Sequence, residues 1–113
     1  MKSTKEYLDY VLNDVLPQLD GLTAKPMFGG FGIWKDGIFI AYIHEDQLYF
    51  KVDEEIKKEF EEMGSQPFIY SPETETDPEK IFYWSVPEEI MDDPEKVKAW
   101  ALKSFEIAKK KRK

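Results

Sequence analysis

The chain has 113 residues, of which 42% are hydrophobic and 15% aromatic, so it can form one folded domain with its own core and is not a disordered chain. It contains no cysteine, which excludes disulfides, thiolate catalysis and cysteine-bound zinc. The net charge is −7, and because Lys109–Lys113 carries +5, the remainder carries −12 (−7 less +5). A body this acidic is a poor surface for nucleic acid.

We expect a single domain over residues 1–113 with a basic tail at 109–113. We also expect a cytoplasmic location, because no apolar signal segment opens the chain.

The first half of the chain predicts a helix followed by four strands. Ser3-Thr4-Lys5-Glu6 has capping-box spacing, and apolar residues then recur at helical intervals, so we expect a helix over 4–19. A strand at 23–28 and a glycine-rich segment at 29–32 follow. Asp36-Gly37 lies between the apolar runs 31–35 and 38–44, and this dipeptide favours a two-residue type I′ turn. Glu45-Asp46 then leads into a strand at 47–52.

The second half predicts two further helices and two short strands. Asp53 is placed to cap a helix that runs through Met63, with Gly64 as the residue after its C-cap. Strands are expected at 67–70 and 81–86, a polar connection at 71–80, and a single helical turn at 87–91. Asp93-Pro94 opens a last helix that runs through Lys110. The order α-β-β-β-β-α-β-β-α predicts a two-layer α+β fold, an antiparallel sheet with flanking helices.

Two-residue turns would fix which side chains share a face of this sheet. They pair Ile33 with Ile40 and Tyr42 with Tyr49. The predicted core face then holds Gly32, Trp34, Phe39, Ala41, Ile43, Leu48, Phe50 and Val52. The opposite face should be polar in a one-sided sheet, but it holds Phe31, Ile33, Ile38, Ile40, Tyr42 and Tyr49. Either a helix of the same chain covers this second face, or it is an interaction surface, most simply of a homodimer.

Candidates for catalysis or ligand chemistry are few. Gly29-Gly30-Phe31-Gly32 lacks phosphate-loop spacing and precedes a strand, so we interpret its glycines as a sign of a bulge or close packing. His44, the single histidine, lies beside a predicted turn, and the acidic clusters fall at helix starts, where they act as caps. Tyr83-Trp84 has no basic sequence neighbours and is interpreted as core or interface rather than a base-stacking platform. We therefore predict no catalytic residue, no cofactor and no metal site.

Several motifs taken together resemble the N-terminal domain of the TfoX/Sxy regulators of bacterial competence. The motifs are Met27-Phe28-Gly29-Gly30-Phe31-Gly32, Asp36-Gly37, Leu48-Tyr49-Phe50-Lys51-Val52-Asp53, Gly64-Ser65-Gln66-Pro67-Phe68, Tyr83-Trp84-Ser85-Val86-Pro87-Glu88-Glu89 and Asp93-Pro94-Glu95. The similarity extends from about Leu8 through the last helix. It implies a two-layer α/β fold and a non-enzymatic regulator linked to DNA uptake, which acts with a cyclic-AMP-dependent transcription activator. Longer regulators carry a second domain, which we do not expect after Lys113.

These observations predict a non-enzymatic protein-interaction domain whose partner belongs to the transcription machinery, with a homodimer as a further expectation. The expected interaction surface is the face with Phe31, Ile33, Ile40, Tyr42 and Tyr49. Two alternatives stay open. One is a small-molecule sensor or enzyme with a pocket near Met27–Gly32, and the other is weak nucleic-acid binding through the basic tail. Strong direct nucleic-acid binding and membrane association are not expected.

Overall fold

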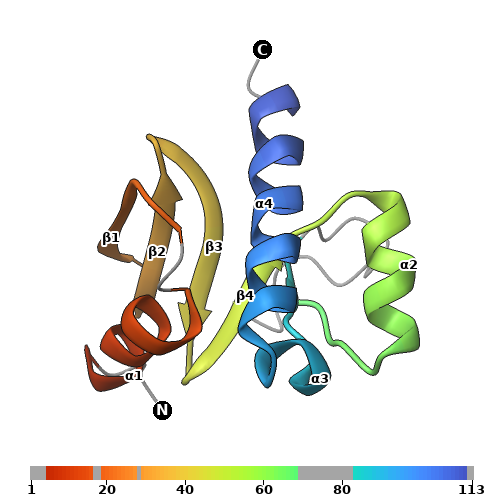
Figure 1. Cartoon of the computed structure of the whole chain (residues 1–113), viewed down its shortest axis with the longest axis horizontal. Helices are drawn as coiled ribbons and strands as arrows, with labels where there is room; N and C mark the ends of the chain where they lie inside the picture. Colours follow the sequence, from red (N-terminus) through yellow and green to blue (C-terminus); the bar gives the residue numbers. More distant parts are fainter. Residues whose placement is uncertain (1–4, 17–18, 28, 69–82, 112–113) are drawn as a thin grey trace.

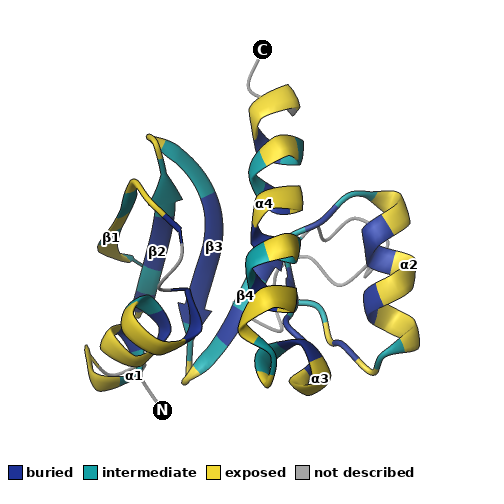
Figure 2. Ribbon diagram, viewed as in Figure 1, coloured by how far each residue is buried: buried dark blue, intermediate teal, exposed yellow. Residues whose placement is uncertain are grey.

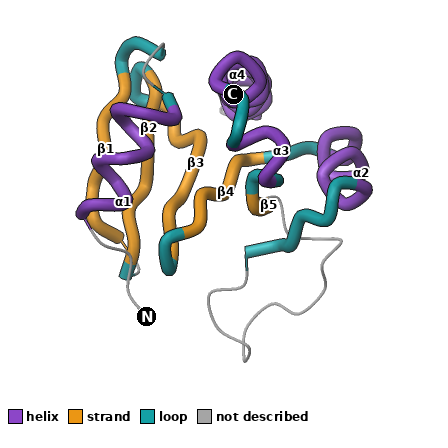
Figure 3. The backbone as a smooth tube through the Cα atoms, turned by 60° about the horizontal axis from the view of Figure 1, so that its bottom comes forward, coloured by secondary structure: helices purple, strands orange, loops and turns teal. Residues whose placement is uncertain are grey.

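The computed structural model describes residues 5–16, 19–27, 29–68 and 83–111. Its strands are β1 (Leu22–Met27), β2 (Gly30–Lys35), β3 (Ile38–His44), β4 (Gln47–Lys51) and β5 (Tyr83–Ser85), and its helices are α1 (Lys5–Tyr10), η1 (Val11–Val15), α2 (Glu54–Glu62), α3 (Glu88–Met91) and α4 (Pro94–Lys111). A five-stranded antiparallel sheet follows the chain order β1-β2-β3-β4-β5. Helix α4 crosses β3 and β4 and also contacts η1, so the N-terminal and C-terminal helices cover the same face of the sheet (Figure 1). Figure 3, turned by 60°, shows α4 above the gap between β3 and β4, and α2 beyond β5. This arrangement confirms the predicted α+β fold.

The predicted helix caps are present. Asp53 accepts a hydrogen bond at Oδ1 from the Ile56 N–H at 2.9 Å, and Asp93 accepts one from the Glu95 N–H at 3.0 Å. Gly64 follows α2 with φ +90°, a conformation that glycine adopts without strain. Short-range hydrogen bonding of side chain to backbone therefore sets the boundaries of α2 and α4.

Two predicted elements differ from the structure. The first helix was expected to continue as an α-helix, but after Tyr10 it widens into the π-helical η1, in which the Leu16 N–H donates to the Val11 carbonyl at 2.8 Å. Of the strand expected at 67–70, Pro67 forms one bridge with Trp84, and residues 69–70 lie outside the described residues. The same holds for the predicted connection at 71–80.

A β-bulge in β3 changes the predicted register. The turn itself is as expected, because Asp36 and Gly37 have φ +50° and +83° and Trp34 pairs with Phe39. Ile33, however, pairs with Ala41, so that Ile40 is an extra residue in β3. The predicted pairing of Ile33 with Ile40 was wrong, since a turn fixes the register only as far as the first interruption of the ladder.

The bulge also redistributes side chains between the two faces. Ile33 and Ile40 are fully buried in the helix-packed core, and Phe31 packs against it, whereas Trp34 and Phe39 turn to the other face. The five residues expected to form one interaction surface, Phe31, Ile33, Ile40, Tyr42 and Tyr49, therefore do not share a face. The predicted core set divides in the same way. Ala41, Ile43, Leu48, Phe50 and Val52 lie in the core, and Gly32, Trp34 and Phe39 lie outside it.

The core depends on small side chains along one stripe of α4. Val97, Ala101, Ser104 and Ala108 are all buried at helical spacing, which lets α4 approach the sheet closely (Figure 2). The ladder between β3 and β4 ends at the pair of Ala41 and Phe50, before β4 itself ends. Just past that point, Ser104 Oγ donates to the Lys51 carbonyl at 2.8 Å. The helix thereby replaces a hydrogen bond that the diverging strands do not make.

We expect Ser104→Ala to lower the free energy of unfolding by about 1–2 kcal/mol, because it leaves the Lys51 carbonyl without its buried donor. Alanine exceeds serine in helix propensity by roughly 0.5 kcal/mol, which partly offsets this loss. Ala99→Ser, at an exposed position of the same helix, measures the propensity difference alone. Denaturant unfolding of both variants decides the point: a Ser104→Ala protein as stable as the wild type would mean that the hydrogen bond contributes nothing.

Candidate functional site

The side chains that the sequence offered for catalysis are engaged in structural contacts. The His44 ring stacks with Tyr42, with 6.0 Å between ring centres, and meets the edge of Phe68 at 5.4 Å. Its Nδ1 lies 3.8 Å from Oε1 of Glu45, whose side chain is half exposed and is not a buried carboxylate. Among the described residues, no three His, Asp or Glu side chains gather in a way that could hold a metal ion.

The buried Ser65 and the half-buried Ser85 join two distant motifs. Ser65 Oγ donates to the Ser85 carbonyl at 2.5 Å, and Ser85 Oγ accepts from the Gln66 N–H at 3.0 Å. The backbone continues this pairing, because the Phe68 N–H donates to the Tyr83 carbonyl at 2.8 Å. Segments 64–68 and 83–86, two of the motifs that carry the family resemblance, thus lie side by side at the β5 edge of the sheet.

The glycine segment is built for a turn and for close packing. Gly29 has φ +80° and open space around the position of a Cβ, whereas a Cβ on Gly30 would overlap the Ile43 carbonyl oxygen. A Cβ on Gly32 would lie 2.7 Å from Met27 Sδ and 2.9 Å from the Trp34 ring. This confirms the interpretation of close packing for Gly30 and Gly32, whereas Gly29 serves the turn. Phe28 lies outside the described residues.

Aromatic rings gather on the face of the sheet opposite the helices. Phe39 lies between Trp34 and Tyr83, with ring centres 5.0 and 5.6 Å away, and Phe68 packs on Tyr42 at 5.0 Å. None of these residues belongs to the helix-packed core. All but Tyr42 are half-buried, so they are not fully covered by the described residues. We call this set the outer aromatic surface; its members are Trp34, Phe39, Tyr42, Tyr49, Phe68 and Tyr83.

The main components of this surface could not be identified from the sequence. Trp34 and Phe39 were assigned to the core because residues 38–43 are all apolar, and a bulge at Ile40 within such a run leaves no visible break in the alternation of polar and apolar residues. Phe68 reaches the surface only through the pairing of its segment with β5. The one sequence signal available was Gly32, whose missing side chain leaves room for Trp34 and Phe39.

Lysines accompany the outer aromatic surface. Although the chain has 23 acidic residues, none lies in β1–β5, whereas three lysines do. Lys25 Nζ lies 5.6 Å from the Trp34 ring centre, and Lys51 Nζ lies 4.9 Å from that of Tyr83. Both are favourable cation–π contacts. The basic neighbour that Tyr83 lacks in sequence is therefore Lys51 of the adjacent strand β4.

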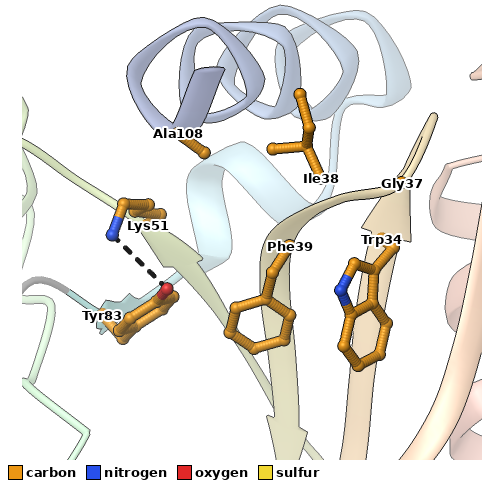
Figure 4. A pocket seen from close by; sticks show the side chains of 7 residues that line it. All are labelled: Trp34, Gly37, Ile38, Phe39, Lys51, Tyr83 and Ala108. Carbon is orange, nitrogen blue, oxygen red and sulfur yellow. Dashed lines mark hydrogen bonds between the residues drawn. The ribbon is translucent and has the colours of Figure 1, made fainter. Parts of the chain in front are cut away.

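A hollow of about 420 Å³ opens where β3 and β4 diverge (Figure 4). Figure 4 shows the rings of Trp34, Phe39 and Tyr83 on one side of it and Ile38 directed towards α4 on the other. Lys51 Nζ donates to the Tyr83 hydroxyl at 3.4 Å. Burial raises the pKa of Tyr83 to about 12, so desolvation outweighs the attraction of the lysine for a phenolate. The Tyr83 hydroxyl therefore keeps its proton at neutral pH.

A second, smaller hollow of about 150 Å³ lies beside Met27. Its walls are the side chains of Met27, Phe39, Tyr42, Phe68 and Tyr83. The Tyr42 hydroxyl, one of two polar side-chain groups among these residues, donates to the Met27 carbonyl at 2.6 Å. Within the described part of the chain, this site does not bring several polar groups together at one point.

We expect the stability difference between the wild type and Tyr83→Phe to depend on pH only in the alkaline range. The pKa of Tyr83 is about 12 in the folded protein and about 10 when unfolded. Below pH 10 both states hold the proton and the difference is constant. Between pH 10 and 12 the unfolded wild type ionises while the folded protein does not, so the wild type loses stability that the variant retains. Urea unfolding of both proteins at pH 8 to 11.5 measures this, and a pH-independent difference would contradict it.

The two neighbouring glycines should respond differently to alanine. Gly30→Ala forces a methyl group into the Ile43 carbonyl and should cost more than about 2 kcal/mol of stability. Gly29→Ala places alanine at a positive φ without a clash and should cost about 1–2 kcal/mol. Thermal unfolding followed by circular dichroism compares the two variants. A larger loss of stability for Gly29→Ala than for Gly30→Ala would show that the close approach of the Ile43 carbonyl to Gly30 does not determine the cost.

Comparison with protein families matches residues 14–108 to the TfoX N-terminal domain. A search of the curated proteins finds no match. In the part of the chain that the structure describes, no helix is long and apolar enough to cross a membrane. Because the matched segment spans most of the 113 residues, the chain belongs to the TfoX N-terminal domain family, a domain family found in competence regulators.

Proposed function

We propose that this chain is a non-enzymatic protein-interaction domain that binds a protein partner through its outer aromatic surface. The observation that carries the proposal is the cluster of half-buried rings on the face away from the helices, with Phe39 in contact with both Trp34 and Tyr83. Tryptophan and tyrosine are the residues in which binding energy concentrates at protein interfaces. They supply large contact areas and lose little side-chain freedom on binding.

Family membership supports a regulatory role for this surface. The domain occurs in competence regulators, so we place the partner in the transcription machinery and the protein in the cytoplasm. His44 and the serines make structural contacts, which supports a role without catalysis. A second copy of this chain is the simplest other partner, since a two-fold contact would cover both outer aromatic surfaces at once.

The other two functions considered from the sequence receive less support. The hollow near Met27 is about 150 Å³, below the range of roughly 300–1,000 Å³ typical of small-molecule sites. In the basic tail, Lys109 lies 5.4 Å from the Phe105 ring centre and 3.9 Å from Glu106. These contacts favour a role for Lys109 within α4. Cations near the C-terminus of a helix stabilise it through the helix dipole.

Capture of partners from the native cell, with proteins and nucleic acid both analysed, tests the proposal. We expect the wild type and Leu102→Lys to retain the same protein, and Phe39→Lys to lose it. Phe39 lies on the outer aromatic surface, whereas Leu102 is an exposed apolar residue of α4 and serves as the matched control. Both variants should keep the wild-type circular dichroism spectrum, because neither side chain belongs to the core.

Light scattering of the same three proteins identifies a homodimer. If the partner is a second copy, the wild type and Leu102→Lys are dimers and Phe39→Lys is a monomer.

Deletion of 109–113 should remove any residual nucleic acid from the captured material, since five cations neutralise few phosphates. Capture that is the same with Phe39→Lys as with the wild type would contradict a role of the outer aromatic surface.

A further inference from the structure

A groove with a volume of about 400 Å³ lies between α2 and α4. Figure 1 shows the two helices next to each other, with α2 on the side of α4 away from β3. The apolar side chains that line the groove come from both helices and are Ile56, Ala99, Leu102 and Ile107. Leu102 is 37% exposed and is, with Tyr10, one of two large hydrophobic side chains that the described part of the chain leaves exposed. Contact with an apolar group of another molecule would remove this surface from water.

Acidic side chains outnumber basic ones along this groove. Its charged lining residues in the described part of the chain are Asp53, Glu55, Glu59, Lys103 and Glu106. The Lys103 ammonium lies 4.0 Å from the centre of the Trp100 ring, where a cation–π contact holds it. Glu55 and Glu59 are both exposed, and their side chains form no hydrogen bond or ion pair with another described residue. Their carboxylates are therefore accessible to a bound cation.

The spacing of Glu55 and Glu59 adds a second reason for a cationic occupant. Residues four apart are neighbours on one face of a helix, and like charges at this spacing repel each other. A cation between the two carboxylates would replace this repulsion with attraction. The guanidinium group of arginine suits the position best, because its planar set of donors matches carboxylate geometry and it is more weakly hydrated than an ammonium group.

A protein segment fits the groove better than a metal ion, a polyamine or a nucleic acid. Within the described ranges, no three His, Asp or Glu side chains are arranged to hold a metal ion. A polyamine carries charge but no bulky apolar group to cover Leu102, and the acidic rim repels a phosphate backbone. The tail of a second copy is also a poor occupant, since Lys109–Lys113 contains no apolar residue. The charge and the apolar lining together are complementary to a basic, partly apolar segment of a different protein.

We propose that the groove between α2 and α4 binds a segment of a partner protein in which an arginine adjoins a leucine or another large aliphatic residue. The arginine guanidinium pairs with the carboxylates of Glu55 and Glu59, and the aliphatic side chain packs on Leu102 and Ile107. None of the described lining residues belongs to the outer aromatic surface. This second site therefore goes beyond the proposed function and does not depend on it.

Nuclear magnetic resonance titration of the ¹⁵N-labelled protein tests this assignment. The probes are acetyl-Arg-Leu-amide, acetyl-citrullyl-Leu-amide, in which a neutral isostere replaces the arginine, and spermidine. The backbone amide signals of Glu55 and Leu102 should shift with the arginyl peptide. We expect this peptide to bind at least about fivefold tighter than the citrullyl peptide, since exposed ion pairs are weak singly but two carboxylates act together here. The preference should fall as salt is added.

Matched variants locate the preference within the groove. Glu55→Gln with Glu59→Gln removes both charges and keeps the side-chain shape, so the affinities for the two peptides should come within about twofold of each other. Glu61→Gln with Glu62→Gln is the control, because it changes the charge of the same helix by the same amount at exposed positions that do not line the groove; the preference should remain. Leu102→Lys should lose the arginyl peptide, since it removes the apolar contact and adds a like charge. Circular dichroism confirms that each variant is folded.

The outcomes separate this inference from the proposed function. Equal affinity for the two peptides, a preference that survives the double change in the groove or disappears in the control pair, or spermidine binding as tight as that of the arginyl peptide overturns the assignment. Phe39→Lys should bind the arginyl peptide as the wild type does, because Phe39 does not line the groove; loss of the peptide from this variant would also overturn it. Leu102→Lys in turn should keep the protein held by the outer aromatic surface. Failure of the peptide test therefore leaves the role of the outer aromatic surface in place, and failure of the capture test leaves the groove.

Discussion

The extra residue at Ile40 determines which side chains the sheet presents to its helices. With strict alternation through β3, Trp34 and Phe39 would lie under α4, and Ile33 would lie on the opposite face. The small stripe of Ala101, Ser104 and Ala108 brings the helix too close for two large rings. The bulge instead buries Ile33 and Ile40 completely, and burial of each is worth roughly 1.5–3 kcal/mol. One inserted residue thus reconciles a close helix with a strand full of large apolar side chains.

The same irregularity links the interior of the domain to its candidate binding site. A bulge bends its strand, and in this sheet β3 separates from β4 after the pair of Ala41 and Phe50. On the helix side the separation leaves a carbonyl at Lys51, which Ser104 satisfies. On the outer side it opens the hollow between Phe39 and Tyr83. Strands and a buried hydrogen bond hold the walls of this hollow, so its shape does not depend on a loop.

Local chemistry explains which parts of this fold could be read from the sequence. Asp36-Gly37, the Asp53 cap and the Asp93-Pro94 start each act within a few residues, and the structure contains all three. The register beyond Trp34 depends on the fit between β3 and α4, which are far apart in sequence, so the turn could not predict it. The family motifs at 64–68 and 83–86 were recognisable, but their pairing follows from tertiary contacts. The candidate site lies where these non-local effects meet, and for that reason its central rings were assigned to the core.

The net charge of this chain does not show how its charged residues are distributed over the fold. Among the described residues, the acidic side chains lie in helices, turns and connections, while β1–β5 carry lysines and no acid. At physiological ionic strength the Debye length is about 8 Å, so a charged group on the outer face of the sheet interacts mainly with the side chains next to it, and Lys25 and Lys51 are among them. A polyanion extends well beyond that distance and meets the acidic body as well. The net charge of −7 therefore repels a nucleic-acid backbone, although the strands themselves carry lysines.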